Sequence, residues 1–204
     1  GALVLRDVDD DGDLDAFVAN LGYKYQGSQN RLYLNDGSGF FFDVTAINLP
    51  TESKESQSLA LGDVDGDGDV DALIGDVRTP NRLYLHDGCG VFSDATSSMP
   101  QPDSILTPAV ALSDIDGDGD LDALVGCDHP MMTPRVPMPA THLYLNSGTG
   151  IYSDWRALNL PEDSDDTWAL ALGDVDGDDD LDVLVGNETQ NRLYLNEEIG
   201  RAHV

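Results

Sequence analysis

The stretch that decides the fold is DVDGDGDVD at residues 63–71, with a short apolar run on each side. Close variants occur three more times, as DVDDDGDLD at 7–15, DIDGDGDLD at 114–122 and DVDGDDDLD at 174–182. We call these four segments the acidic turns and number their residues from 1 to 9. They recur about every 50 to 60 residues, and self-similarity at such a period indicates a repeat architecture.

The segments around each acidic turn predict short β-strands. In the second repeat, apolar runs at 59–61 and 72–74 flank the turn, and further runs follow at 82–86 and 91–95. Runs of four to six residues that end in Asn, Asp or Gly favour strands over helices. Four short strands in a repeat of this length are typical of a β-propeller blade.

We therefore expect an all-β fold, a β-propeller of four-stranded blades with an acidic turn between the first two strands of each blade. Three blades are complete and the fourth lacks its last strand. The expected repeats cover residues 1–197, approximately as 1–49, 57–99, 108–160 and 168–197. Residues 198–204 continue no repeat, and we expect them to be a non-native tail.

Composition narrows the functional classes. The 204 residues are 40% hydrophobic, which is enough for a packed core. The formal net charge of -29 excludes a nucleic-acid-binding protein and binding to anionic membranes, because both need clustered Lys and Arg. The sequence has no apolar run long enough for membrane insertion.

The acidic turns predict calcium sites. Asp at positions 1, 3, 5 and 9 and the backbone carbonyl of position 7 offer hard oxygen ligands in a flexible loop, which suits Ca²⁺ better than Mg²⁺. An EF-hand needs Glu at position 12, where this chain has Val18, Ile74, Val125 or Val185. A single acidic turn could be a set of solvent-exposed side chains that bind nothing. Four copies argue against that interpretation, because the clustered carboxylates repel one another.

The acidic turn, the following NRLYLN and the later GxFxD together resemble the FG-GAP/VCBS repeats of integrin α-chain propellers and bacterial surface proteins. The resemblance covers essentially the whole chain, although the literal Phe-Gly and Gly-Ala-Pro elements are absent. It implies about one Ca²⁺ per turn, four in this chain. The implied ligands are Asp7, Asp9, Asp11, Asp13, Asp15, Asp63, Asp65, Asp67, Asp69, Asp71, Asp114, Asp116, Asp118, Asp120, Asp122, Asp174, Asp176, Asp178, Asp180 and Asp182.

The resemblance also implies a secreted or cell-surface location and a role in ligand binding or adhesion. We expect a fragment of a bacterial protein, with further blades of the same propeller missing from this chain. The alternative is a closed four-bladed propeller. No catalytic motif is present, so we expect no enzyme activity. A second function class remains open, a non-catalytic structural or carbohydrate-binding accessory domain of a larger secreted enzyme.

A protein or carbohydrate ligand would bind on the face opposite the acidic turns, where two loops between second and third strands are long. Residues 20–30 offer Tyr23, Tyr25 and Gln26, and residues 127–141 offer His129 and Arg135. The simpler interpretation is that both loops are tolerated surface insertions.

Two smaller expectations follow from the repeat. Cys89 and Cys127 fall on opposite faces of neighbouring blades, about one strand length apart, so we expect no disulfide between them. Asp179 stands at position 6 of its acidic turn, where the other turns have Gly12, Gly68 and Gly119. We expect a backbone cost there if this position needs a positive φ.

Overall fold

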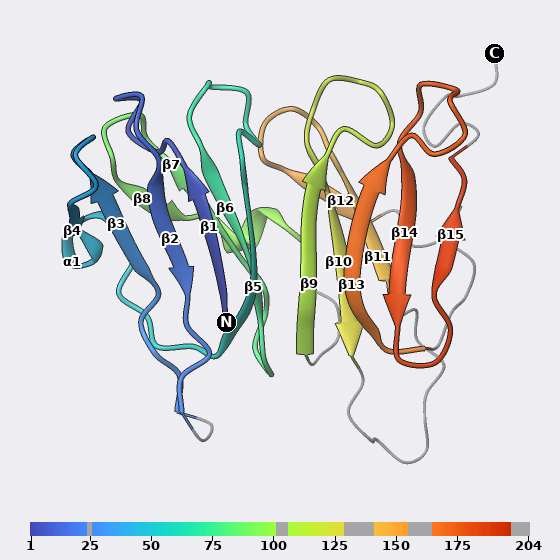
Figure 1. Cartoon of the computed structure of the whole chain (residues 1–204), viewed down its shortest axis with the longest axis horizontal. Helices are drawn as coiled ribbons and strands as arrows, with labels where there is room; N and C mark the ends of the chain where they lie inside the picture. Colours follow the sequence, from blue (N-terminus) through green and yellow to red (C-terminus); the bar gives the residue numbers. More distant parts are fainter. Residues whose placement is uncertain (24–25, 101–105, 129–140, 155–164, 197–204) are drawn as a thin grey trace.

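The computed structural model describes residues 1–204 except 24–25, 101–105, 129–140, 155–164 and 197–204. The described chain forms four antiparallel sheets (Figure 1). The first contains β1 (Ala2–Arg6), β2 (Asp15–Ala19), β3 (Arg31–Asn35) and β4 (Phe41–Asp43), and the second contains β5 (Ser56–Gly62), β6 (Asp71–Asp76), β7 (Arg82–His86) and β8 (Phe92–Asp94). The third contains β9 (Leu106–Ser113), β10 (Asp122–Asp128), β11 (Thr141–Asn146) and β12 (Tyr152–Asp154), and the fourth contains β13 (Thr167–Gly173), β14 (Asp182–Asn187) and β15 (Arg192–Tyr194).

Every sheet has its strands in sequence order, so each is an up-and-down unit of the kind that makes a propeller blade. This confirms the all-β fold and the four-stranded repeat. The fourth sheet has three described strands, and the predicted tail at 198–204 lies outside the described residues. A short helix, α1 (Thr45–Asn48), and a 3₁₀ turn, η1 (Thr96–Ser98), follow the last strands of the first two sheets. Neither has the length and apolar character needed to cross a bilayer.

The four sheets stand in a row, joined through their first strands. Strand β1 contacts β5, β5 contacts β9, and β9 contacts β13. The first and fourth sheets lie at opposite ends of this row, and the acidic turns all lie at its upper edge (Figure 1). The described strands do not close into a four-bladed ring, which was the alternative considered in the sequence analysis.

The core consists of three apolar layers, one between each pair of neighbouring sheets. In the first layer, Phe17 of β2 packs edge-on against Phe92 of β8, with ring centroids 5.7 Å apart. The second layer contains Leu73 and Tyr144, and the third contains Leu124. Each inner sheet therefore contributes both of its faces to the core.

Hydrogen bonds from asparagine side chains add to two of these layers. Asn146 ends β11 and donates from Nδ2 to the carbonyl of Val64 in the second sheet, at 2.6 Å. Asn196 takes the same place in the fourth sheet and donates to the carbonyl of Ile115, at 2.9 Å. The equivalent residue of the second sheet is His86, and its two buried ring nitrogens have no hydrogen-bond partner in the described chain.

Cys89 is exposed and Cys127 is buried, and the two do not form a disulfide. Cys89 lies in the turn after β7, at the edge that carries the acidic turns, whereas Cys127 lies near the far end of β10. The predicted absence of a disulfide is confirmed.

The two end faces of the row expose side chains whose equivalents are buried inside it. Leu184 in β14 is 48% exposed, whereas Leu124 at the same place in β10 is completely buried. At the other end, Leu3 is 60% exposed and its equivalent Leu59 is 7% exposed. Since the residue types match, the difference comes from the neighbouring sheet that covers one position and not the other.

This contrast predicts that a leucine-to-alanine substitution lowers the free energy of unfolding by different amounts at the two positions. Leu124→Ala should lower the free energy of unfolding by about 2 to 5 kcal/mol, because it leaves a cavity in the third layer. Leu184→Ala should cost less than about 1 kcal/mol, because its side chain is half in water. Urea unfolding of both variants measures the difference. Equal costs would show that the end face is covered in solution.

Candidate metal centres

Each acidic turn brings three carboxylates together. Positions 1 and 3 follow the first strand of the sheet, and position 9 begins the second strand. The turn folds these positions back on one another, so that one oxygen from each side chain lies within 4.8 Å of the other two. The four groups are Asp7, Asp9 and Asp15; Asp63, Asp65 and Asp71; Asp114, Asp116 and Asp122; and Asp174, Asp176 and Asp182.

The carboxylate at position 9 is buried and held at both oxygens. The N–H of Val64 donates to Oδ2 of Asp71 at 2.8 Å, and the N–H of His86 donates to Oδ1 at 2.8 Å. One bond closes the acidic turn and the other ties it to the third strand. The same two bonds, at 2.8 to 3.0 Å, recur at Asp15, Asp122 and Asp182.

Position 1 shapes the turn itself. Asp63 accepts from the N–H of Gly66 at 2.8 Å and from the N–H of Gly68 at 3.0 Å. In the first turn, Asp7 accepts through Oδ2 from the N–H of Gly12 at 3.0 Å. Its Oδ1 is buried and has no hydrogen-bond partner among the described residues. An oxygen placed in this way is suited to coordinate a cation.

The electrostatics of the turns also favour a cation. Burial and, after it, the neighbouring carboxylate of Asp67 raise the pKa of Asp65. Burial likewise raises the pKa of Asp71 to about 7 and that of Asp122 to about 6. These groups are costly to ionise together in a partly desolvated turn, and a bound divalent cation would offset that cost. An all-oxygen donor set fits Ca²⁺.

The other predicted ligand positions lie outside these triads. At position 5, Asp67 accepts from the N–H of Asp69 at 2.9 Å, a local turn bond that recurs in the other acidic turns. At position 7, the Asp69 carboxylate lies against Gly88 in the turn between β7 and β8. The structure thus brings positions 1, 3 and 9 together, and ligation by positions 5 and 7 stays a prediction.

The predicted ligand-binding residues are only partly described. Tyr23 and Gln26 pair through two backbone hydrogen bonds of 3.1 Å at the tip of the loop after β2. Both are exposed, and the Tyr23 side chain is 73% exposed. Tyr25, His129 and Arg135 lie outside the described residues.

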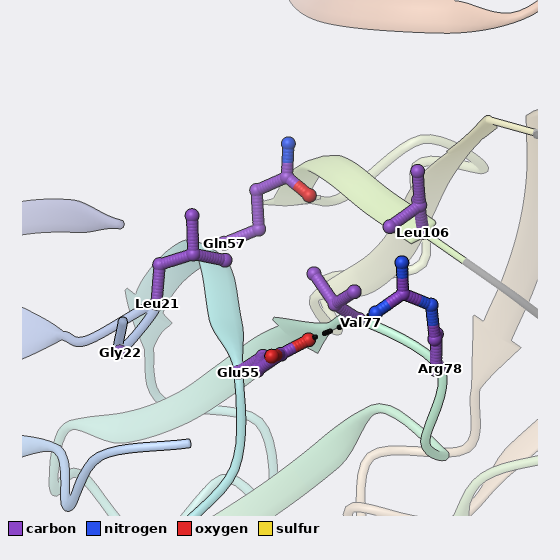
Figure 2. Close-up of a pocket in the computed structure, with 7 residues that line it drawn as sticks. All are labelled: Leu21, Gly22, Glu55, Gln57, Val77, Arg78 and Leu106. Atoms are coloured by element: carbon purple, nitrogen blue, oxygen red, sulfur yellow. Dashed lines mark hydrogen bonds and ion pairs between the residues drawn. The ribbon is translucent and has the colours of Figure 1, made fainter. Parts of the chain in front are cut away.

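Sequence reasoning missed a pocket of about 340 Å³ on the face opposite the acidic turns (Figure 2). Its lining includes Leu21 from the loop after β2, Glu55 just before β5, Gln57 within β5, and Val77 and Arg78 just after β6. The ligand residues predicted from the long loops are not among its lining, which combines the first residues of the 20–30 loop with residues beside β5, after β6 and at the start of β9. The presence of Arg78 where the first repeat has a glycine was the available signal.

A family model described as FG-GAP-like repeat matches residues 7–74, 63–125 and 138–185. Among curated proteins, cartilage acidic protein 1 of Mus musculus is 28% identical over 142 residues, which cover 60% of this chain and 22% of the mouse protein. The Xenopus tropicalis protein of the same name is 31% identical over 102 residues, 48% of this chain and 16% of that protein. The matched region is thus less than a quarter of these relatives.

Among solved structures, this chain is similar to a lectin of Agrocybe aegerita described as specifically recognising non-reducing terminal N-acetylglucosamine. The TM-score is 0.55 at 18% identity, and the match covers 97% of this chain and 49% of the lectin chain. At this identity the similarity shows the fold alone. The expected bacterial source stays a prediction.

The bonds at position 9 predict a stability defect that does not depend on metal. Asp71→Ala should lower the free energy of unfolding by about 2 kcal/mol or more in excess chelator, because two N–H groups in buried backbone lose their partner. Asp67→Ala is the matched control, since it removes one exposed turn bond and should cost less than about 1 kcal/mol. Equal effects in denaturant unfolding would contradict the assigned role of position 9.

Position 6 of the turn needs a left-handed backbone. Gly12, Gly68 and Gly119 have φ of +94°, +98° and +100°, and Asp179 at the same place has +73°. A Cβ on any of these three glycines would meet nothing within 4 Å, so the penalty at Asp179 is in the backbone and not in crowding. The condition set in the sequence analysis, a positive φ at position 6, is therefore met.

Asp179→Gly should therefore stabilise the chain by up to about 1 kcal/mol in calcium, since the relief of strain exceeds the added freedom of the unfolded chain. The reciprocal change, Gly119→Asp, should destabilise it by a similar amount. Thermal unfolding in millimolar calcium compares the two. Destabilisation by Asp179→Gly would mean that this carboxylate itself binds the cation.

Proposed function

Because the chain belongs to the family of FG-GAP-like repeats, we propose that it is a calcium-stabilised β-propeller module of an extracellular protein. The observation that carries the proposal is the same carboxylate triad at four equivalent turns. A chance acidic cluster would have no reason to recur at one place in the repeat. Exposed turns of this kind suit the high calcium concentration outside cells, where modules bind with Kd of about 10⁻⁴ to 10⁻³ M.

Within each turn, the carboxylates at positions 1, 3 and 9 would hold the ion, with positions 5 and 7 as the further expected ligands. The ion supplies positive charge that neutralises the clustered carboxylates. Position 9 is also tied to the third strand, so the bound ion would hold the first three strands of the sheet together. We propose about one Ca²⁺ per turn, four in this chain, in a structural role.

The module's function would be binding without catalysis. Among the described residues, every metal-type cluster of acidic side chains belongs to an acidic turn. The opposite face remains for a protein or carbohydrate ligand, and it carries the pocket and the exposed Tyr23. The lectin similarity is consistent with such a face on this fold. Ligand binding or cell-surface adhesion is the function we favour.

The second candidate is an accessory domain of a larger secreted enzyme, either structural or carbohydrate-binding. This candidate is supported by the short extent of the matches, which cover less than a quarter of the curated relatives. A catalytic domain beside the repeats in the full-length protein would support this candidate. Further repeats or a surface anchor would support the adhesion module.

The calcium proposal predicts that chelation lowers the melting temperature. Binding to the folded state alone stabilises it by about 0.4 to 1.4 kcal/mol for each site at a free concentration of about 1 to 10 Kd, the range that millimolar Ca²⁺ reaches at the Kd given above. Millimolar Ca²⁺ should restore the melting temperature after chelation, and Mg²⁺ should restore it poorly because it demands a tighter octahedral shell. Differential scanning calorimetry measures both effects.

A pair of substitutions separates the turns from general charge effects. Asp65→Asn removes a triad carboxylate and should reduce the calcium-dependent rise in melting temperature. Asp94→Asn removes an acidic residue at the end of β8, outside the triads, and should leave that rise unchanged. Equal melting temperatures of the unmodified protein in chelator and in millimolar calcium would overturn the metal assignment.

A further inference from the structure

The pocket on the face opposite the acidic turns lies where three sheets meet. Leu21 and Gly22 follow β2 of the first sheet, Glu55 and Arg78 lie just before β5 and just after β6 of the second, and Leu106 begins β9 of the third (Figure 2). Its volume of about 340 Å³ is at the lower end of the range for small-molecule sites. The pocket would therefore take one compact ligand.

The polar groups of the pocket include both donors and acceptors. Nη1 of Arg78 lies 3.4 Å from Oε2 of Glu55, with the guanidinium half exposed and the carboxylate mostly buried (Figure 2). Gln57 adds a side-chain amide. A guanidinium donates, a carboxylate accepts and an amide does both, so a matching ligand must itself donate and accept. Hydroxyl groups have this property.

The remaining walls are apolar. Leu21, Val77 and Leu106 line the pocket between the polar groups. Aliphatic side chains of this kind pack against C–H groups and offer nothing to a charged group. An anionic ligand is further disfavoured by the Glu55 carboxylate and by the net charge of -29. A ring that carries hydroxyls on its edge and C–H groups on its face satisfies both kinds of wall.

The backbone at Arg78 is an independent observation. Its φ is +59°, in the left-handed region that disfavours every residue with a side chain. Gly22 occupies the same place in the first repeat and has φ +79°. A glycine would therefore adopt this conformation without strain, yet the second repeat has an arginine there. Strain of this kind, about 1 to 3 kcal/mol, is concentrated at functional sites.

We propose that this pocket is a saccharide site, in which Arg78, Glu55 and Gln57 bind the hydroxyl groups of one neutral sugar residue. Leu21, Val77 and Leu106 receive its C–H face. The inference deepens the binding role proposed above and rests on it. It names the ligand as a neutral saccharide, and it makes Arg78 the residue that determines binding.

The test titrates the protein, in millimolar calcium, with the methyl glycosides of glucose, galactose, mannose and N-acetylglucosamine, and separately with galacturonic acid. At least one neutral glycoside should bind with millimolar affinity or better, as measured by calorimetry or ligand-observed NMR. Arg78→Gly should weaken that binding by about tenfold or more, while its melting temperature stays equal or rises because strain is relieved. A purely structural arginine would give the opposite pattern, a lower melting temperature with binding retained.

Two further variants serve as controls. Gln57→Ala should also weaken binding, and it changes no strained backbone. Arg31→Gln removes an exposed arginine that pairs with Asp43 outside the pocket and should leave binding unchanged. The proposal is overturned if no neutral glycoside binds, if binding survives Arg78→Gly, or if only galacturonic acid binds.

The calcium-dependent melting temperature is measured on the same samples, so the two proposals fail separately. A calcium-dependent melting temperature without saccharide binding overturns the saccharide site alone. If the protein binds a saccharide but its melting temperature does not depend on calcium, the saccharide site is supported and the calcium proposal is overturned.

Discussion

The buried aspartate at position 9 of each acidic turn is the constraint on which the rest of the structure depends. One oxygen closes the turn and the other reaches the third strand, as Asp71 does with Val64 and His86. These two bonds set where the second strand begins and how the third strand lies beside it. They also turn the carboxylate toward positions 1 and 3. One side chain thus takes part both in the hydrogen bonds that organise the sheet and in the donor set of the proposed ion.

Much of this was readable from the sequence because the repeat is local. The acidic turn predicts the strand boundaries on both sides of it, and Asp179 was recognised as an exception from its place alone. The burial of individual side chains was harder to predict from the sequence. Leu124 and Leu184 have the same sequence context, and only the presence of a neighbouring sheet makes one buried and the other exposed. The sequence did not distinguish the five acidic positions, whereas the fold brings the carboxylates at positions 1, 3 and 9 together. Ligation by positions 5 and 7 stays a prediction.

The pocket shows why function is harder to predict here than fold. Its polar residues lie around the start of β5 and just after β6 of the second sheet, and its apolar walls include Leu21 and Leu106 from the neighbouring repeats, so the lining forms no continuous sequence pattern. The long loop after β2 contributes Leu21 and Gly22 to the pocket, whereas the predicted Tyr23 is exposed and does not line it. The sequence shows Arg78 where the first repeat has Gly22, and the structure adds that the arginine keeps the left-handed backbone of that glycine. The replacement is visible in the sequence, but its backbone strain is visible only in the structure.

The acidic turns and the pocket lie at opposite ends of the same strands, and this separation has a consequence for how calcium would act on binding. Strand β5 has seven residues, so it holds the turn at 63–71 about 20 Å from the pocket. At that distance the ion cannot touch a ligand, and it would act by raising the fraction of molecules whose sheets are folded. The apparent dissociation constant equals the intrinsic one divided by that fraction. Calcium would therefore behave as a concentration-dependent switch on the number of competent sites, with the affinity of each competent site unchanged.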